Sequence, residues 1–397
     1  MKYLILVGDG MGDRPVAELG GRTPLEAAET PHMDRLARTG RLGLSRTIPE
    51  GMSPGSDTAN MSLMGYDPGR YHTGRSPIEA AAMGVDLGPG QIAFRCNLVT
   101  LDRVAGVTMA DYAAGHITTP EAAAVIASLD EILGRPGLKF HPGVSYRHLL
   151  VWDNGPLTAA TVPPHDRSGQ AVDDVLPQDG ELGRVADLIR ASWPLLAQHP
   201  VNQARLAAGE NPANSIWLWG QGTRPSFPTY QERFGLTGFT VSAVDLVKGL
   251  GLLAGLAAVE VPGATGWLDT NYAGKVAAVL EGLATHDLAF LHVEAPDEAG
   301  HGGKLDLKLQ AIADFDARVV GPVLAGLAAL GPHRVLLATD HYTPLEVMTH
   351  TREAVPFVLW DSRAAVAGGR AYHEAAAAAA GFRVEQAHQL IKLLLER

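Results

Sequence analysis

The sequence predicts an α/β protein whose mostly parallel sheet is interrupted by an inserted α+β domain. Short apolar runs at residues 3–7, 290–293 and 334–338 have the composition of buried strands, and each leads into an acidic loop. After residue 214, apolar runs alternate with helix-like segments, which is typical of parallel βαβ units. Residues 93–213 have a different texture, with alternating strand-like runs separated by turns. These three observations favour an open sheet with an insertion.

The first part of the chain alternates strands with helices that begin at Thr-Pro or Ser-Pro. Thr30 is the expected N-cap of a helix that starts at Pro31 and ends at Gly40. Ser76 and Pro77 have the same pattern. The predicted elements are strands at 1–8 and 42–47 and helices at 31–40, 58–64 and 76–84.

The middle of the chain is expected to form strands at 92–101 and 146–152 around a helix at 119–133. It contains arginines and histidines, but no strand that ends on Asp or His. The later elements are strands at 240–243, 258–261, 288–293, 334–338 and 356–360 and helices at 244–250, 272–283, 304–330 and 385–397. We therefore expect a discontinuous domain of residues 1–96 and 214–397 and an inserted domain of residues 97–213.

Composition excludes several classes of protein. Hydrophobic residues make up 46% of the 397 residues and charged residues 19%, so a sizeable core is available. The net charge of −11 argues against nucleic acid or an anionic membrane as the main partner. Cys96 is the single cysteine and is expected to be buried. With no disulfide possible, no signal peptide and no apolar run of about 18 residues, we expect a soluble cytoplasmic protein.

Acidic and imidazole side chains follow three of the predicted strands. Because the carboxyl ends of parallel strands meet at one edge of a sheet, these groups are expected to converge. Asp297 and His301 are four residues apart, so one helical turn brings them to the same face. The candidate ligands are Asp9, Asp297, His301, Asp340, His341 and His350, with Ser56 as a candidate nucleophile.

A mixed carboxylate and imidazole set suits Mn²⁺ or Zn²⁺, and six ligands are about right for two ions. Two ions can stabilise the attacking and leaving oxygens of a phosphoryl transfer and activate a serine hydroxyl. Each residue alone has an ordinary structural interpretation, since Asp and Ser at strand ends usually cap helices or form turns. The recurrence at three strand ends favours a metal centre.

Several motifs mark a resemblance over nearly the whole chain. Gly8-Asp9-Gly10, Asp297-x-x-Gly-His301, Thr339-Asp-His341 and a downstream His350 resemble the alkaline phosphatase superfamily. Ser-Pro-Gly-Ser56-Asp-Thr-Ala-Asn60 and the segments around residues 71–80, 94–97, 242–251 and 261–266 closely resemble the archaeal-type cofactor-independent phosphoglycerate mutases. The resemblance implies an alkaline-phosphatase-like three-layer domain with a mostly parallel central sheet and an inserted α+β cap domain.

The resemblance also implies roles for individual residues. Asp297, His301 and His350 would hold one divalent ion, and Asp9, Asp340 and His341 the other, which Ser56 also touches. Mn²⁺ is the expected ion, with Zn²⁺, Co²⁺ and Mg²⁺ as alternatives, and no 2,3-bisphosphoglycerate is needed. Lys248 would contact the transferring phosphate. The candidates for binding glycerate in the inserted domain are Arg95, Asp111, His116, Arg147 and His165.

The implied activity is interconversion of 2- and 3-phosphoglycerate through a phosphoserine at Ser56. The partner is then a small phosphorylated hydroxy acid, and assembly into a homo-oligomer is an open expectation. Two alternatives stay open. One is a metal-dependent phosphatase or a phosphotransferase acting on another hydroxy acid such as homoserine; the other is a metal-binding module without activity.

Overall fold

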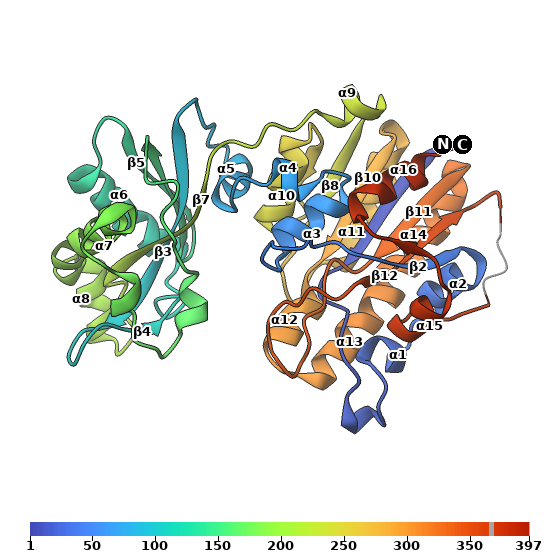
Figure 1. The fold of residues 1–397 in the computed structure, drawn as a ribbon, viewed down its shortest axis with the longest axis horizontal. Helices are drawn as coiled ribbons and strands as arrows, with labels where there is room; N and C mark the ends of the chain where they lie inside the picture. The colour runs from blue at the N-terminus through green and yellow to red at the C-terminus, as the bar shows by residue number, and fades with distance from the viewer. Residues whose placement is uncertain (365–368, 397) are drawn as a thin grey trace. The chain divides into compact units, whose positions relative to one another are not determined.

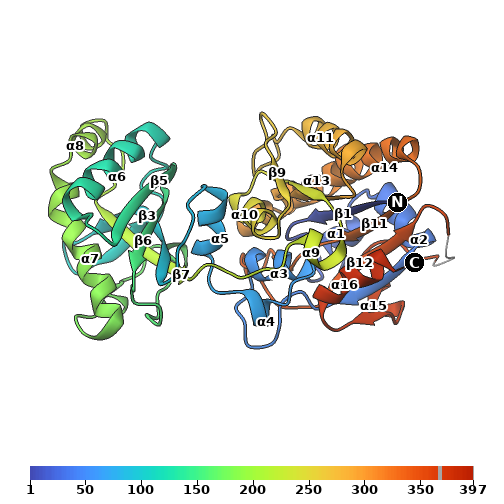
Figure 2. The same cartoon turned by 90° about the horizontal axis from the view of Figure 1, so that it is seen from above.

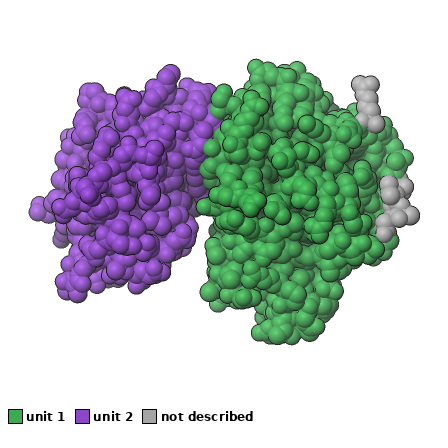
Figure 3. Space-filling view, in the orientation of Figure 1, with its two compact units in different colours: residues 1–72, 226–397 green, residues 73–225 purple. Residues whose placement is uncertain are grey.

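The computed structural model describes residues 1–364 and 369–396, which form two compact units. Unit 1 contains residues 1–72 and 226–397, and unit 2 contains residues 73–225 (Figure 3). The predicted boundaries at 96/97 and 213/214 thus lie inside unit 2. The reason is that β3 (Gln91–Asp102) is one continuous strand that pairs with β7 (Ser215–Gly222), so a domain boundary cannot cut between them.

Unit 1 is built on an eight-stranded sheet in the described part of the chain (Figure 1). Only β12 runs antiparallel to its neighbours, so the predicted mostly parallel sheet is confirmed. The strand order is β13 (Arg383–Val384), β2 (Arg41–Ser45), β12 (Val355–Asp361), β11 (His333–Ala338), β1 (Lys2–Gly8), β10 (Leu288–Val293), β8 (Gly238–Val241) and β9 (Ala257–Val259).

Helices cover both faces of this sheet and make a three-layer unit. Figure 2 shows α11, α13 and α14 on one face and α3 and α16 on the other. The helices are α1 (Pro24–Ala27), α2 (Pro31–Thr39), α3 (Ser56–Leu63), α4 (Pro68–Tyr71), α9 (Tyr230–Phe234), α10 (Asp245–Leu253), α11 (Tyr272–Thr285), α12 (Ala295–His301), α13 (Leu305–Phe315), α14 (Gly321–Leu327), α15 (Glu374–Ala379) and α16 (Leu390–Leu395). The predicted terminal helix 385–397 is shorter than expected, and its residue 397 lies outside the described residues.

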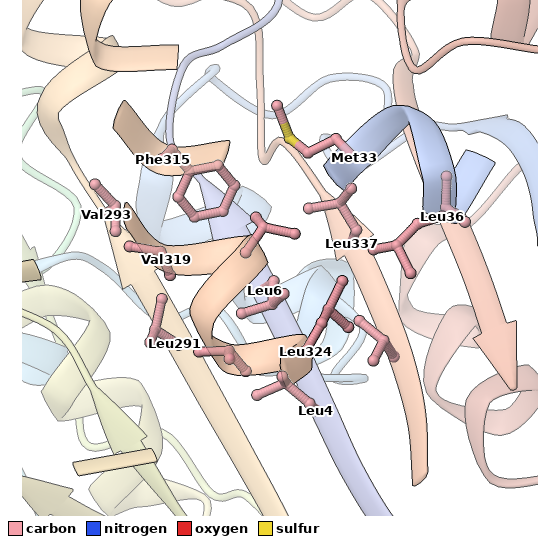
Figure 4. Close-up of a cluster of buried hydrophobic side chains, with 14 of the residues drawn as sticks. Leu4, Leu6, Met33, Leu36, Leu291, Val293, Phe315, Val319, Leu324 and Leu337 are labelled. Carbon is pink, nitrogen blue, oxygen red and sulfur yellow. The ribbon is translucent and has the colours of Figure 1, made fainter. Parts of the chain in front are cut away.

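Alternation along the strands directs one set of apolar side chains into the main core. Leu4 and Leu6 of β1 and Leu291 of β10 are fully buried and pack with Phe315 and Val319 (Figure 4). Ile5 of β1 and Phe290 of β10 alternate with them and are also fully buried, on the face that α3 and α16 cover (Figure 2). This burial on both faces explains why the central strands are continuous apolar runs.

The predicted helix 304–330 is interrupted. A π-helical turn, η4 (Asp316–Val320), separates α13 from α14. The buried Asp316 carboxylate accepts hydrogen bonds from the backbone N–H groups of His32 (3.2 Å) and Met33 (2.7 Å) at the start of α2. Thr30 makes no side-chain cap, so the distant Asp316 satisfies the helix end that Thr30 was expected to cap.

Unit 2 is an α+β domain with an antiparallel sheet. Strands β4 (Thr108–Asp111), β6 (Arg147–Asp153) and β7 pair with β3, and β5 (Leu138–Val144) pairs with β6. Its helices are α5 (Ser76–Ala82), α6 (Thr119–Leu133), α7 (Gly180–Ala197) and α8 (Pro200–Ala207); α7 and α8 are not among the predicted elements. Cys96 is buried in the core of this unit, as predicted.

Ser76 is not an N-cap. It is the first residue of α5, and its hydroxyl donates to the carbonyl of Gly220 (2.7 Å) and accepts from the backbone N–H of Arg95 (2.6 Å). The serine therefore fastens α5 to β3 and β7 instead of capping its own helix.

Lys308 forms a buried ion pair that sequence reasoning missed. Its ammonium donates to Asp13 Oδ2 (2.7 Å), the Thr343 carbonyl (2.8 Å) and the Gly12 carbonyl (3.2 Å). Both side chains are almost completely buried, so removing the cation leaves a carboxylate without its partner. Lys308→Met is expected to lower the free energy of unfolding by about 3–5 kcal/mol.

Urea unfolding measures this loss. Lys304→Met, which removes the exposed lysine at the N-cap of α13, is the matched control and should change stability by less than about 0.5 kcal/mol. Equal urea midpoints for the two variants would contradict the prediction.

Candidate active site

The register of three central strands brings the acidic loops together. β1 lies between β10 and β11, with Val7 opposite His292 on one side and Ala338 on the other. Because all three strands are parallel and in step, the loops that follow them leave the sheet at one edge. Gly10 allows the close approach, since it has φ +59 and a Cβ there would lie 2.7 Å from the Asp297 Cα.

Asp9, Asp340 and His341 form the first group of candidate ligands. One ligand atom from each lies within 4.8 Å of the others, and all three side chains are fully buried. His341 Nε2 is 3.3 Å from Asp340 Oδ2 and 3.4 Å from Asp9 Oδ1. The Ser56 hydroxyl, at the first residue of α3, lies 3.1 Å from the same His341 nitrogen. The predicted hydroxyl and the predicted ligands therefore share one site.

Asp297, His301 and His350 form the second group. Asp297 and His301 lie one turn apart on α12, as their spacing predicts, with His301 Nε2 3.2 Å from Asp297 Oδ2. His350 Nε2 is 3.5 Å from Asp297 Oδ1 and 2.9 Å from His301 Nε2. His341 Nδ1 is 4.0 Å from Asp297 Oδ1, so the two groups are adjacent.

Electrostatics agree with a site built for cations. Burial, and then the carboxylates of Asp340 and Asp297, raise the pKa of Asp9 well above its usual value. Burial and Asp297 likewise raise the pKa of Glu294 to about 8. Although burial acts to raise it, the imidazoles of His350 and His301 hold the pKa of Asp297 well below its usual range. Carboxylates crowded without water are unfavourable unless cations neutralise them.

The donor set also fits divalent ions. Asp9 Oδ1 is buried and has no hydrogen-bond partner among residues 1–364 and 369–396, which is the state expected of an oxygen that binds a metal. Carboxylate and imidazole ligands together suit Mn²⁺, Zn²⁺ or Co²⁺. The described residues thus contain groups able to hold divalent ions.

Four residues around the site were not predicted. Asn60 Nδ2 donates to Asp340 Oδ2 (2.9 Å) and to the Ser56 carbonyl (3.0 Å). Thr343 Oγ1 donates to Asp297 Oδ1 in a short hydrogen bond. His292 and Glu294 lie with Asp9 in a third group whose ligand atoms are within 4.8 Å. Asn60 has a sequence signal, because its i+4 spacing from Ser56 on a helix places it beside the serine.

Lys248 is placed in α10 with its ammonium 2.7 and 2.8 Å from the two Glu260 oxygens. Lys275 contacts a central strand, since its ammonium donates to the carbonyl of His292 in β10 (3.1 Å). Burial lowers the pKa of Lys275 to about 8. A role of Lys248 in phosphate binding stays a prediction.

Most of the predicted glycerate-binding residues lie around a group of aromatic rings in unit 2. The His116 ring is 6.1 Å from that of Tyr146, over which the Arg147 guanidinium lies at 5.4 Å. The His165 ring is 5.7 Å from Trp219, over which Arg95 lies at 5.3 Å. Tyr112 connects the two pairs, with ring centroids 6.0 Å from Tyr146 and 6.2 Å from His165.

Arg95 and Asp111 have structural partners within unit 2. The Arg95 guanidinium is buried, forms a short ion pair with Glu79 and donates to Asn97 Oδ1 (3.3 Å). The Asp111 carboxylate accepts from the backbone N–H groups of Ala113 (2.8 Å) and Gly115 (2.7 Å). Asp111 thereby shapes the turn that carries His116, while Arg147 is exposed.

Comparison with known proteins assigns the family. The sequence model of 2,3-bisphosphoglycerate-independent phosphoglycerate mutase matches residues 37–202. A protein of Geobacter sulfurreducens, named a probable 2,3-bisphosphoglycerate-independent phosphoglycerate mutase, is 53% identical over 399 residues and covers 100% of both chains. This chain belongs to the 2,3-bisphosphoglycerate-independent phosphoglycerate mutases. A mutase of this family from Methanothrix thermoacetophila is 51% identical over 396 residues, again 100% of both chains. The predicted resemblance is confirmed.

Solved structures agree in fold. The PH0037 protein from Pyrococcus horikoshii is 30% identical in sequence and has a TM-score of 0.82. The comparison covers 100% of this mutase-family chain and 96% of the PH0037 chain. The cofactor-independent phosphoglycerate mutase from Thermoplasma acidophilum is 26% identical, with a TM-score of 0.63 over 100% and 99% of the two chains. Among residues 1–364 and 369–396, no helix combines the length and the hydropathy that a membrane crossing needs.

Proposed function

We propose that this chain interconverts 2-phosphoglycerate and 3-phosphoglycerate by way of a phosphoserine at Ser56. The observation that carries the proposal is the Ser56 hydroxyl, which lies 3.1 Å from His341 Nε2 and beside two groups of carboxylates and imidazoles whose carboxylates are buried. The names of relatives that match the whole chain favour a mutase over the alternative of a phosphatase or a homoserine phosphotransferase.

Two divalent ions complete the proposed site. Asp297, His301 and His350 would hold one, and Asp9, Asp340 and His341 the other, with Ser56 next to the second. Bound there, the ions would supply positive charge against the phosphoryl oxygens and lower the pKa of the attacking hydroxyl. Mn²⁺ is the ion we propose, because mixed carboxylate and imidazole sites accept it readily.

The chain's own residues perform the transfer. Ser56 Oγ loses its proton and forms a bond to phosphorus as the bond from phosphorus to the substrate oxygen breaks. That oxygen takes up a proton, which leaves glycerate and a phosphorylated serine. The second hydroxyl of the same glycerate then takes the phosphoryl group from Ser56, so no water is consumed and no phosphate is released. Asn60 would keep Ser56 and Asp340 in place through its two hydrogen bonds.

Unit 2 is proposed to hold the glycerate between the two transfers. A planar guanidinium suits a carboxylate, and Arg147 is exposed beside Tyr146. His116, His165 and Arg95 surround the same aromatic rings, and Asp111 shapes the turn that positions His116. Lys248 is assigned to the phosphate. A cytoplasmic location and assembly into a homo-oligomer stay predictions.

Parallel measurement of isomerisation and hydrolysis tests the proposal. Purified protein with Mn²⁺ is incubated with 3-phosphoglycerate, and 2-phosphoglycerate and inorganic phosphate are followed in the same sample by phosphorus NMR. We expect the 2-isomer to form with phosphate release at least about 100-fold slower, because the serine returns its phosphoryl group to glycerate. Phosphate release as the main reaction, or transfer to added homoserine, would instead support the alternative.

A further inference from the structure

His292 contacts a candidate metal ligand through one ring nitrogen and a serine hydroxyl through the other. It is a fully buried residue of β10. Its Nε2 is 2.8 Å from Asp9 Oδ2, and its Nδ1 is 3.2 Å from Ser242 Oγ. Together with Asp9 and Glu294 it also forms a set whose ligand atoms lie within 4.8 Å, so His292 could be taken for a further metal ligand.

The hydrogen bonds around Ser242 indicate which nitrogen of His292 carries the proton. Ser242 Oγ accepts from the backbone N–H of Val244 (3.0 Å), which leaves its own hydrogen free to point at His292 Nδ1. With Nδ1 accepting, the proton of the neutral ring is on Nε2. Nε2–H then donates to Asp9 Oδ2, which accepts the hydrogen bond.

The two oxygens of Asp9 are therefore not equivalent. Oδ2 accepts from His292. Oδ1 is buried, lies 3.4 Å from His341 Nε2 and has no hydrogen-bond partner in the part of the chain that the structure describes. A carboxylate fixed at one oxygen presents the other in a single direction. Both ring nitrogens of His292 are occupied, so neither has a lone pair to offer an ion.

We propose that His292 is a positioning residue, which together with Ser242 holds Asp9 so that Oδ1 alone binds the cation shared with Asp340 and His341. This inference rests on the metal centre of the proposed function. In this arrangement His292 orients the ligand Asp9 and does not itself bind the ion. A residue that hydrogen-bonds to a metal ligand commonly raises metal affinity by about 10- to 100-fold.

Calorimetric titration of Mn²⁺ into chelator-treated, buffer-exchanged protein tests the inference without measuring activity. The wild type should show two binding events, of which Asp340→Asn weakens one and Asp297→Asn the other. His292→Leu should weaken the Asp340-dependent event about 10- to 100-fold and leave the Asp297-dependent event unchanged. His292→Gln keeps an N–H donor at a similar distance from the main chain and should recover part of the lost Mn²⁺ affinity.

Ser242→Ala and Thr240→Val form a matched pair. Ser242→Ala removes the hydroxyl that fixes the His292 tautomer, and we expect a loss of about 3- to 10-fold in the same event. Thr240 is buried in the preceding strand, and its hydroxyl donates to the Ala257 carbonyl (3.3 Å) with no connection to Asp9. Thr240→Val should leave both events as in the wild type.

The outcomes separate this inference from the proposed function. Two events in the wild type that His292→Leu leaves unchanged would overturn the inference alone. If His292→Leu does not fold, an unchanged Asp340-dependent event in Ser242→Ala would overturn it instead. A wild type that binds no Mn²⁺, Zn²⁺ or Co²⁺ would overturn both the metal centre and the inference.

Discussion

Ser56→Ala is expected to lower the rate of phosphoglycerate isomerisation at least about 10⁴-fold while the protein still binds Mn²⁺. The Ser56 hydroxyl is the group proposed to take the phosphoryl group, and alanine leaves the candidate ligands Asp340 and His341 in place. The measurement is the rate of 2-phosphoglycerate formation at saturating Mn²⁺, with the metal content of the variant determined in parallel.

Ser62→Ala is the matched control for this experiment. Ser62 is buried in the same helix, and its hydroxyl donates to the Thr47 carbonyl (2.5 Å), away from the candidate ligands. It should reduce stability by about 1 kcal/mol and keep most of the activity. Intact mass analysis should detect a phosphorylated wild type and an unmodified Ser56→Ala protein. Isomerisation retained by Ser56→Ala would rule out the phosphoserine route.

Removal of divalent ions is expected to abolish activity, with a loss on the order of 10³-fold or more, and to lower the melting temperature. The carboxylates of Asp9, Asp340 and Glu294 remain crowded in a buried site when no cation is present. An ion present at 1,000 times its Kd stabilises the folded state by about 4 kcal/mol, which the chelated protein lacks.

The decrease in melting temperature on chelation should be larger at pH 8 than at pH 5. Burial, and after it Asp297, raise the pKa of Glu294 to about 8 from its ordinary value of 4.5. A group with a raised pKa in the folded state stabilises the metal-free protein below about 4.5, and this stabilisation is lost as the pH rises toward 8. Asp9 changes in the same direction. Melting curves with EDTA and with excess Mn²⁺ at both pH values measure this decrease. Mn²⁺ added back to the chelated protein should restore the melting temperature. An equal difference at pH 5 and pH 8 would contradict the electrostatic argument.

The parts of the site that the sequence predicts are those with a local signal. β10 spans residues 288–293, as expected from its apolar run, and α12 puts Asp297 and His301 on one turn. Asp9 and Asp340 follow strands that could be recognised from composition, and parallel strands share one edge. For these residues, a few neighbours in the chain determine both the conformation and the direction of the side chain.

The parts that sequence reasoning missed depend on contacts between distant segments. Asp316 satisfies the N-terminus of α2 from a position 283 residues further along the chain. Lys308 neutralises Asp13 over a similar separation of 295 residues. No periodicity or capping rule connects such pairs, because the energy of each contact is realised only after the sheet has formed.

The sequence by itself determined the alternation of strands and helices, the acidic strand ends and the family, since each of these depends on short motifs. Only the tertiary structure decided that units 1 and 2 divide at residues 72/73 and 225/226, and that Ser76 anchors a helix instead of capping it. It also decided that Asp9 Oδ2 meets His292, while Oδ1 has no hydrogen-bond partner among the described residues. The physical reason is that local backbone preferences act within a few residues, whereas a buried polar group is satisfied by whichever segment packing brings beside it.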